Sequence, residues 1–186
     1  AGAKQYIDQY FAKADPEEVT AMDYETKANI YSAIPGQEDA LFAIYQEGVK
    51  ADTVIDNKID LLRKGAAYFK SKNMREKEGD MLTMVIALRP KTSINDLFDA
   101  TRAYYFGQAY EKSVGMADKL VEKFPTEIYG YDWRVNNYKV LDSVNANNKL
   151  VPAMVDEFEF AAKDTAKYRK YYMNTAALLL NYYANE

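Results

Sequence analysis

Histidine and cysteine are both absent from this chain of 186 residues. Their absence removes the commonest general base, the thiol nucleophile, every disulfide and the commonest zinc ligands. An enzyme of this composition would have to work with carboxylates or hydroxyl groups alone. The sequence therefore predicts no catalytic residue, no metal site and no cofactor. The lack of cysteine does not decide the compartment, because secreted and cytosolic proteins alike can lack disulfides.

Long apolar runs and an excess of positive charge are missing as well. The longest apolar stretches, near Met81–Leu88 and Ala176–Leu180, are far shorter than the roughly 20 residues of a membrane span. The net charge is −4, whereas binding to nucleic-acid phosphates needs clustered lysine and arginine. We therefore expect no membrane insertion and no nucleic-acid partner. No signal peptide is visible and the first residue is not methionine, which predicts a processed protein or an excised fragment.

Patterns typical of helices run through the whole chain. Apolar residues make up 48% and charged residues 28%, which is typical of a globular protein. No run alternates apolar and polar residues between turn residues, whereas apolar residues recur at three- and four-residue spacing. We expect Asp15-Pro16 to begin a helix, Ser93 to cap another, and Gly107 to mark the turn after it. The sequence predicts ten helices, over residues 4–13, 15–33, 37–50, 52–73, 74–89, 92–108, 110–124, 126–141, 149–163 and 166–184.

A repeat in the thirties is the strongest signal in the sequence. Pro90 and Pro125, 35 residues apart, each end an apolar helix of the same design. Large aromatic residues recur late in the first helix of each pair, at Tyr31, Phe69, Tyr104 and Tyr138. Such a period is typical of stacked helix pairs, which usually bind other proteins and seldom catalyse reactions. Most of the 17 tyrosines are then expected to fill the seams between helices.

The segment from Asp96 to Pro125 resembles a tetratricopeptide repeat. The family places a late aromatic residue, a turn, an aromatic-Glu-Lys-small helix start and a closing proline in this order. These elements are matched here by Tyr104, Gly107, Tyr110-Glu111-Lys112-Ser113 and Pro125, and in the preceding segment by Phe69, Arg75-Glu76-Lys77 and Pro90. The resemblance implies an all-α, right-handed α-solenoid of antiparallel helix pairs with about ten helices. It implies one repeat domain over residues 1–186, with units at 16–53, 54–91, 92–126 and 127–165 and half-pairs at 1–15 and 166–186.

The second half of the chain is similar to divergent tetratricopeptide proteins of gut Bacteroidetes bacteria. The similarity lies in Gly130-Tyr-Asp-Trp-Arg134, a loop at Asp142, Lys167-Tyr168 and Tyr182-Tyr183. More repeats often follow in that family, so we expect this chain to be part of a longer array. The same resemblance favours a bacterial protein of the periplasm or cell envelope. We also expect the two half-pairs to expose apolar faces through which chains pair end to end.

The resemblance implies a binding face as well. In the family, the first helix of each pair lines a concave groove that binds peptides or helices. The matching positions here are Arg63, Lys70, Arg102, Tyr105, Asn136 and Lys139. Arg102 and Asn136 are 34 residues apart, as are Tyr105 and Lys139, so successive units should present them in register. This predicts a scaffold that grips a protein or peptide through charge-assisted hydrogen bonds, although a merely solvated polar face has the same composition.

A carbohydrate-binding component of a bacterial cell envelope system is the alternative function. It requires Trp133 or Tyr129 to be exposed and to stack on a sugar ring. Other chemistry-bearing patterns favour structural roles. The acid pairs Glu157/Glu159 and Asp8/Asp15 are expected to be solvated surface acids. The loop at residues 142–148 lacks the spacing of a calcium site and is expected to serve turns and caps, and the basic aromatic segment 168–172 is expected to pack.

Overall fold

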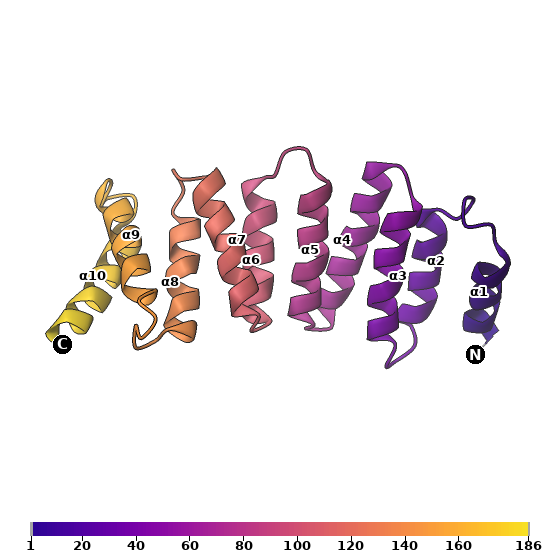
Figure 1. Cartoon of the computed structure of the whole chain (residues 1–186), viewed down its shortest axis with the longest axis horizontal. Helices are drawn as coiled ribbons and strands as arrows, with labels where there is room; N and C mark the ends of the chain where they lie inside the picture. The colour runs from indigo at the N-terminus through magenta and orange to yellow at the C-terminus, as the bar shows by residue number, and fades with distance from the viewer. Residues whose placement is uncertain (1, 186) are drawn as a thin grey trace. The chain divides into compact units, whose positions relative to one another are not determined.

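The computed structural model describes residues 2–185, which form ten α-helices and no strand, so the predicted all-α class is confirmed (Figure 1). The chain divides into two compact units, Ala1–Lys91 and Thr92–Glu186, at the predicted boundary between repeats 54–91 and 92–126. Unit 1 contains α1 (Gly2–Lys13), α2 (Ala21–Ser32), α3 (Glu38–Ala51), α4 (Ile55–Ser71) and α5 (Arg75–Leu88). Unit 2 contains α6 (Ile94–Phe106), α7 (Tyr110–Lys123), α8 (Tyr129–Leu141), α9 (Leu150–Ala162) and α10 (Arg169–Ala184).

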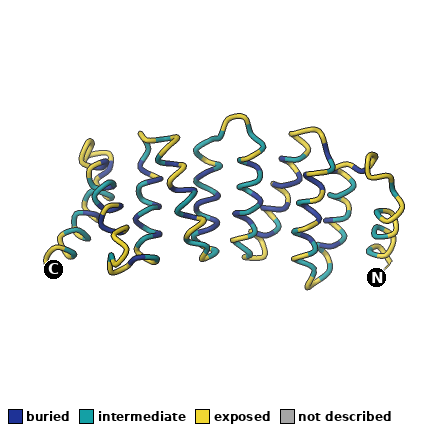
Figure 2. The backbone as a smooth tube through the Cα atoms, viewed as in Figure 1, coloured by how far each residue is buried: buried dark blue, intermediate teal, exposed yellow. Residues whose placement is uncertain are grey.

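Within each unit, successive helices run antiparallel and pack side by side (Figure 1). In unit 1, α2 packs with α3 and α4 packs with α5. In unit 2, α6 packs with α7 and α8 packs with α9. In unit 2, α7 also packs with α8 and α9 with α10, so the grouping of the helices into the expected repeats remains a prediction. The helices α1 and α10 are the two predicted as half-pairs. The buried residues lie along the helices of these pairs, whereas α1 has no buried residue (Figure 2).

Glycines allow the helices of unit 1 to approach closely. A Cβ atom on Gly48 of α3 would lie 2.5 Å from Leu61 Cδ2 on α4 and 2.7 Å from Tyr24 Cβ on α2. A Cβ atom on Gly65 of α4 would likewise lie 3.0 Å from Cδ2 of the Tyr45 ring on α3. A side chain at either glycine would force its neighbours apart. Small and large residues thus interlock the three helices, as the repeat pattern predicts.

A chain of buried hydrogen bonds crosses the core of unit 2. Asn137 Nδ2 of α8 donates to Ser113 Oγ of α7 at 3.0 Å. Ser113 Oγ in turn donates to the main-chain carbonyl of Thr101 on α6 at 3.0 Å. All three side chains are buried. Because an unpaired buried polar group costs free energy, these bonds favour one register of the three helices over others.

The turn between the two helices of a pair repeats after 35 residues. Asn73 and Gln108 both have left-handed backbones, with φ of 58° and 62°. Around them the same hydrogen bonds recur, from Met74 N to the Phe69 carbonyl at 2.8 Å and from Ala109 N to the Tyr104 carbonyl at 2.9 Å. This is the Schellman closure of a helix. Gly107 marks this turn, as predicted: it ends α6 with φ −82°, and the following Gln108 adopts the left-handed conformation.

The starts of α2 and α6 show how capping side chains select helix ends. At α6 the prediction is confirmed, because Ser93 Oγ accepts a hydrogen bond from Asp96 N at 3.1 Å. At α2 the prediction was wrong: the helix begins after Thr20, not at Asp15-Pro16. Thr20 and Asp23 form a reciprocal capping box that satisfies two main-chain donors. Asp15 instead accepts from Glu17 N in a local turn.

Asp52 connects two helix pairs of unit 1. Its buried carboxylate accepts from Val54 N at 2.7 Å and from Asn57 Nδ2 at 3.2 Å, both at the start of α4. It also accepts from Ala21 N at 3.1 Å, which is the first residue of α2. These hydrogen bonds lower the pKa of Asp52 against the opposing effect of its burial. Asp52 therefore accepts main-chain hydrogen bonds beside the starts of two helices at once.

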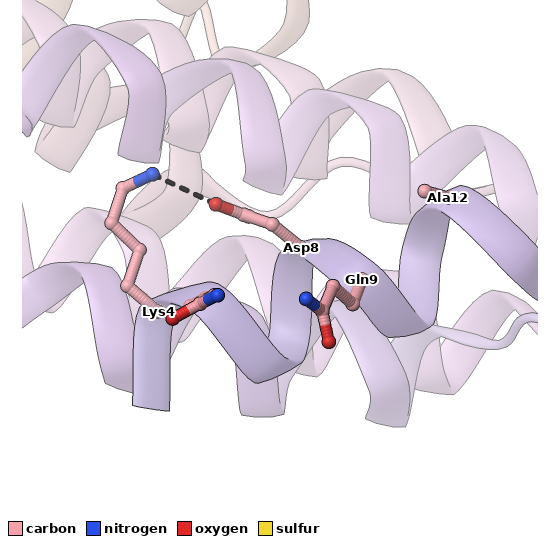
Figure 3. Close-up of a pocket in the computed structure, with 5 residues that line it drawn as sticks. Lys4, Asp8, Gln9 and Ala12 are labelled. Atoms are coloured by element: carbon pink, nitrogen blue, oxygen red, sulfur yellow. Dashed lines mark hydrogen bonds and ion pairs between the residues drawn. The ribbon is translucent and has the colours of Figure 1, made fainter. Parts of the chain in front are cut away.

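The terminal helices of the two units both have exposed outward faces. On α1 the exposed side contains a shallow hollow lined by Lys4, Gln5, Asp8, Gln9 and Ala12 (Figure 3). On α10 the exposed side chains include an apolar stripe of Met173, Leu180 and Tyr183. The expectation of an exposed apolar face therefore fits α10, although Tyr6 and Tyr10 of α1 are exposed as well. Pairing of chains through these ends remains a prediction.

Candidate functional site

Two of the six predicted binding residues, Arg63 and Lys70, lie on α4 in unit 1, and both are exposed. Arg63 lines a hollow of about 540 Å³, whose other charged residues are Asp56, Asp60, Arg89 and Lys91. The hollow carries both signs of charge, so it has no strong preference for an anionic or a cationic group. The other four predicted residues lie in unit 2, where Arg102 and Tyr105 are on α6 and Asn136 and Lys139 are on α8.

An aromatic cluster joins α6 to α8 in unit 2. The ring of Trp133 lies 5.1 Å from Tyr105 and 5.9 Å from Phe98, between ring centroids. Phe98 also meets Tyr129 edge-on at 5.4 Å. Aromatic pairs at these distances add to the stability that burial alone provides. The cluster therefore gives the first helices of two successive pairs a fixed spacing.

Arg102 and Tyr105 are both attached to this cluster. The Arg102 guanidinium lies 5.9 Å from the Phe98 ring centroid, and its Nη2 donates to Asp99 Oδ1 at 2.9 Å. Tyr105 is half-buried because its ring packs on Trp133. The two predicted residues are thus brought together, and each has a packing role beside its exposed part.

Trp133 does not meet the requirement of the carbohydrate-binding alternative. Its side chain is buried, with 9% of its surface exposed. A sugar ring cannot stack on an indole enclosed by Tyr105 and Phe98, so Trp133 does not supply the exposed ring that this alternative needs. Tyr129, with 41% of its surface exposed, is the one residue named for that alternative that remains accessible.

A buried acid centre lies between α8, α9 and α10. Glu157 of α9 is 3% exposed, and its Oε2 accepts a hydrogen bond from Thr175 Oγ1 of α10 at 2.7 Å. The carboxyl group of Asp132 on α8 lies within hydrogen-bonding reach of Glu157. Burial, followed by the nearby Asp132, raises the pKa of Glu157 to about 7. Burial also raises the pKa of Asp132. The prediction that Glu157 is a solvated surface acid was therefore wrong.

The predicted residues Asn136 and Lys139 surround this acid centre. Asn136 lies one turn after Asp132 on the same helix and lowers the pKa of that carboxyl group. Lys139 of α8 and Lys170 of α10 are exposed, and both favour the ionised form of Asp132 by their positive charge. The structure thus joins the four predicted residues of unit 2 to two neighbouring clusters, one aromatic and one acidic, and both include residues of α8.

Asp132, Glu157 and Thr175 were missed as functional candidates, although the sequence contained a signal for Glu157. The buried residues of α9 follow helical spacing and include Leu150, Met154, Glu157, Phe160 and Ala161. Glu157 occupies a core position in this series, where an apolar residue is the norm. An acid in a core position needs a partner that the sequence does not identify, because Thr175 comes from another helix.

The loop between α8 and α9 has the capping role predicted for it. Buried Asp142 accepts from three main-chain amides, Asn147 N at 2.9 Å, Lys149 N at 2.8 Å and Leu150 N at 3.3 Å. These donors lower the pKa of Asp142. Asn145 and Asn148 adopt left-handed backbones, as a tight polar loop requires. In the part of the chain that the structure describes, no group of three or more acidic residues is arranged to hold a metal ion.

Asp8, which lines the hollow on α1, accepts hydrogen bonds from two side chains. Lys4 Nζ donates to Asp8 Oδ2 at 2.8 Å (Figure 3), and the Tyr31 hydroxyl of α2 donates to Asp8 Oδ1 at 2.7 Å. These two hydrogen bonds lower the pKa of Asp8. Asp8 therefore holds α1 on α2, and the hollow beside it is an open strip along a single helix.

A solved structure resembles this chain over nearly its whole length. It is the C-terminal part of a TPR repeat-containing protein from Cytophaga hutchinsonii, a bacterium of the Bacteroidetes. The two structures align with a TM-score of 0.58 and 24% sequence identity, over 97% of this chain and 68% of the other. This chain has the tetratricopeptide-repeat fold. No protein-family model and no curated protein matches its sequence.

In the tetratricopeptide-repeat fold, α4, α6 and α8 are first helices of their pairs, and α10 occupies the corresponding place after α9. The aromatic cluster therefore lies along first helices of unit 2, and the acid centre joins α8 and α10 to Glu157 of the second helix α9. Among residues 2–185, none of the helices combines the length and the apolar character needed to cross a membrane.

Proposed function

We propose that this chain is a scaffold that binds a protein or peptide and does not catalyse a reaction. Binding uses the first-helix face of unit 2, which we define by side chains of α6, α8 and α10: Arg102, Tyr105, Tyr129, Asn136, Lys139 and Lys170. The repeat fold shared with the Cytophaga hutchinsonii protein supports an interaction role. A location in the periplasm or cell envelope is part of the proposal, and fractionation of the source cells tests it.

The observation that carries the proposal is the set of packed side chains that supports this face. Trp133 and Phe98 fix Tyr105 and Tyr129 from below, and Asp132 orders the polar groups around it. Side chains held in this way lose little freedom when a partner binds. Exposed lysines beside aromatic rings suit a partner segment that carries both carboxylate and apolar groups.

The acid centre does not support catalysis, although an acid with a pKa near 7 is often catalytic. Glu157 and its hydrogen-bond donor Thr175 are 3% and 1% exposed. A general acid or base has to reach the proton that it transfers. Glu157 lies instead in the seam between helices, where a structural role fits its surroundings.

Selection of peptides from a random displayed library tests the proposal. Affinities of the selected peptides are measured by calorimetry for Lys139→Ala/Lys170→Ala and for the control Lys119→Ala/Lys123→Ala, which removes two exposed lysines from α7. We expect the first variant to bind about tenfold more weakly and the control to bind like the parent chain. Both variants should keep the parent melting temperature. Equal affinities in the two variants, or no selected peptide at all, contradict the proposal.

A further inference from the structure

The attachment of α10 depends on an unusual contact. Of the sixteen residues of this helix, only Thr175 is buried. Its hydroxyl group donates to Glu157 Oε2 of α9 at 2.7 Å, away from water. The other contacts of α10 come from half-buried side chains such as Leu178, Leu179 and Tyr182. The one buried point of the helix is therefore a hydrogen bond to an ionisable group.

A proton is part of this contact. Two carboxyl groups that hydrogen-bond to each other must share a proton, because two carboxylates have only acceptor atoms. Asp132 and Glu157 are such a pair. The charged and titratable groups that face them are Lys139 of α8 and Lys170 and Tyr171 of α10. Lys139 favours a negative charge on either acid and Lys170 favours it on Asp132, so the shared proton resides on Glu157, whose deep burial makes it the less favourable site for a negative charge.

We propose that Asp132, Glu157 and Thr175 form a proton-dependent clasp that holds α10 against α8 and α9 and loosens when the shared proton is lost. Loss of the proton places two negative charges side by side in a buried seam. Water must then enter to hydrate Glu157. Moving α10 is the least costly way to admit it, since Thr175 is the one buried residue of α10, whereas α8 and α9 each bury several residues.

The clasp also regulates the first-helix face of unit 2. Lys170 lies on α10, so its position beside Lys139 depends on the clasp. This consequence rests on the proposed function, whereas the clasp itself does not. Binding is expected to be strongest in mildly acidic conditions and to weaken as the pH rises through about 7.

Hydrogen exchange of the intact chain, followed by mass spectrometry, tests the clasp without any partner. Protection factors of α10, which compare each exchange rate with that of an unstructured peptide at the same pH, are measured at about pH 5.5 and about pH 8.5. We expect protection of α10 to fall about tenfold or more at the higher pH, while α7 changes little. In Glu157→Gln, the neutral amide accepts from Thr175 and donates to Asp132, so α10 should stay protected at both pH values.

Two further variants keep the test decisive. Glu159→Gln removes an exposed acid two residues further along α9 and should behave like the parent chain. Asp132→Asn removes the competing negative charge beside Glu157, so the midpoint of the loosening should move to lower pH. Equal α10 protection in the parent chain at both pH values would falsify the clasp. So would a pH dependence that survives unchanged in both Glu157→Gln and Asp132→Asn. Because no partner is present, either result leaves the proposed binding function to its own test.

Discussion

Unit 2 contains two buried carboxyl groups, Asp142 in the α8–α9 loop and Glu157 in the seam between α9 and α10, whose pKa values move in opposite directions. Asp142 accepts three main-chain hydrogen bonds, and these lower its pKa. Glu157 accepts one hydroxyl group and lies beside another acid, and its pKa rises. The fraction of exposed surface is nearly the same for both. Main-chain donors therefore dominate at Asp142, whereas burial, followed by the neighbouring Asp132, dominates at Glu157.

The largest expected effect is an opposed dependence of stability on pH at the two sites. Glu157 binds its proton more tightly in the folded chain, so its contribution is greatest at low pH and is lost as the pH rises from about 4.5 to about 7. The unfolding free energy should fall by about 2 to 3 kcal/mol between pH 5 and pH 8. Asp142 contributes in the opposite sense, with stability present above its unfolded pKa and lost as the pH falls through its lowered folded value.

Denaturant unfolding at several pH values measures both effects. The parent chain should be most stable near pH 5, and Glu157→Gln should remove the decline toward pH 8 while leaving the acid limb unchanged. A parent stability that rises from pH 5 to pH 8 contradicts the assignment for Glu157.

A second comparison removes the capping carboxylate of the loop. Asp142→Ala leaves the amides of Asn147, Lys149 and Leu150 without their acceptor at the start of α9. Because unpaired main-chain donors are costly, we expect the melting temperature to fall by about 10 °C. Asp142→Asn retains one acceptor oxygen, so its melting temperature should lie between those of Asp142→Ala and the parent chain. A melting temperature unchanged in Asp142→Ala would mean that water replaces the carboxylate.

The smallest expected effect compares two buried hydroxyl groups. Thr175 donates from α10 to Glu157 on α9, whereas Thr101 donates to the Leu97 carbonyl within α6. At about pH 5.5, where the clasp is closed, Thr175→Val should cost about 1.5 to 3 kcal/mol of unfolding free energy, because buried Glu157 loses its hydrogen-bond donor. Thr101→Val should cost about 1 kcal/mol or less, because the helix keeps its own main-chain bond. The comparison fails if the two variants lose the same stability at about pH 5.5.

The helices and their pairing were predictable because they follow from periodic patterns. The spacing of Tyr31, Phe69 and Tyr104 identified the repeat, and the repeated hydrogen bonds around Asn73 and Gln108 confirm it in the backbone. Helix ends were less predictable where two signals compete. At α2 both Asp15-Pro16 and Thr20 are credible starts, and the reciprocal bonds of Thr20 with Asp23 decide between them.

The candidate site was predictable only in part. Arg102, Tyr105, Asn136 and Lys139 were found by register along first helices, which sets the face of each residue but not its partners. Burial of Trp133 depends on Phe98 and Tyr105 of another helix. Asp132 and Glu157, which share a proton, lie 25 residues apart in the sequence, on α8 and α9. Contacts between helices of this kind have no local signature in the sequence.

The carboxylate of Asp52 has a consequence for how unit 1 unfolds. It accepts from the first residue of α2 and from the start of α4, which belong to successive helix pairs. A linear array in which each pair were stabilised mainly by itself would melt pair by pair. Because the Asp52 carboxylate accepts hydrogen bonds from two neighbouring pairs, any state in which only one pair is intact loses some of these bonds and is higher in energy. Unit 1 is therefore expected to melt with high cooperativity, and loss of this one acid should uncouple its pairs before it unfolds them.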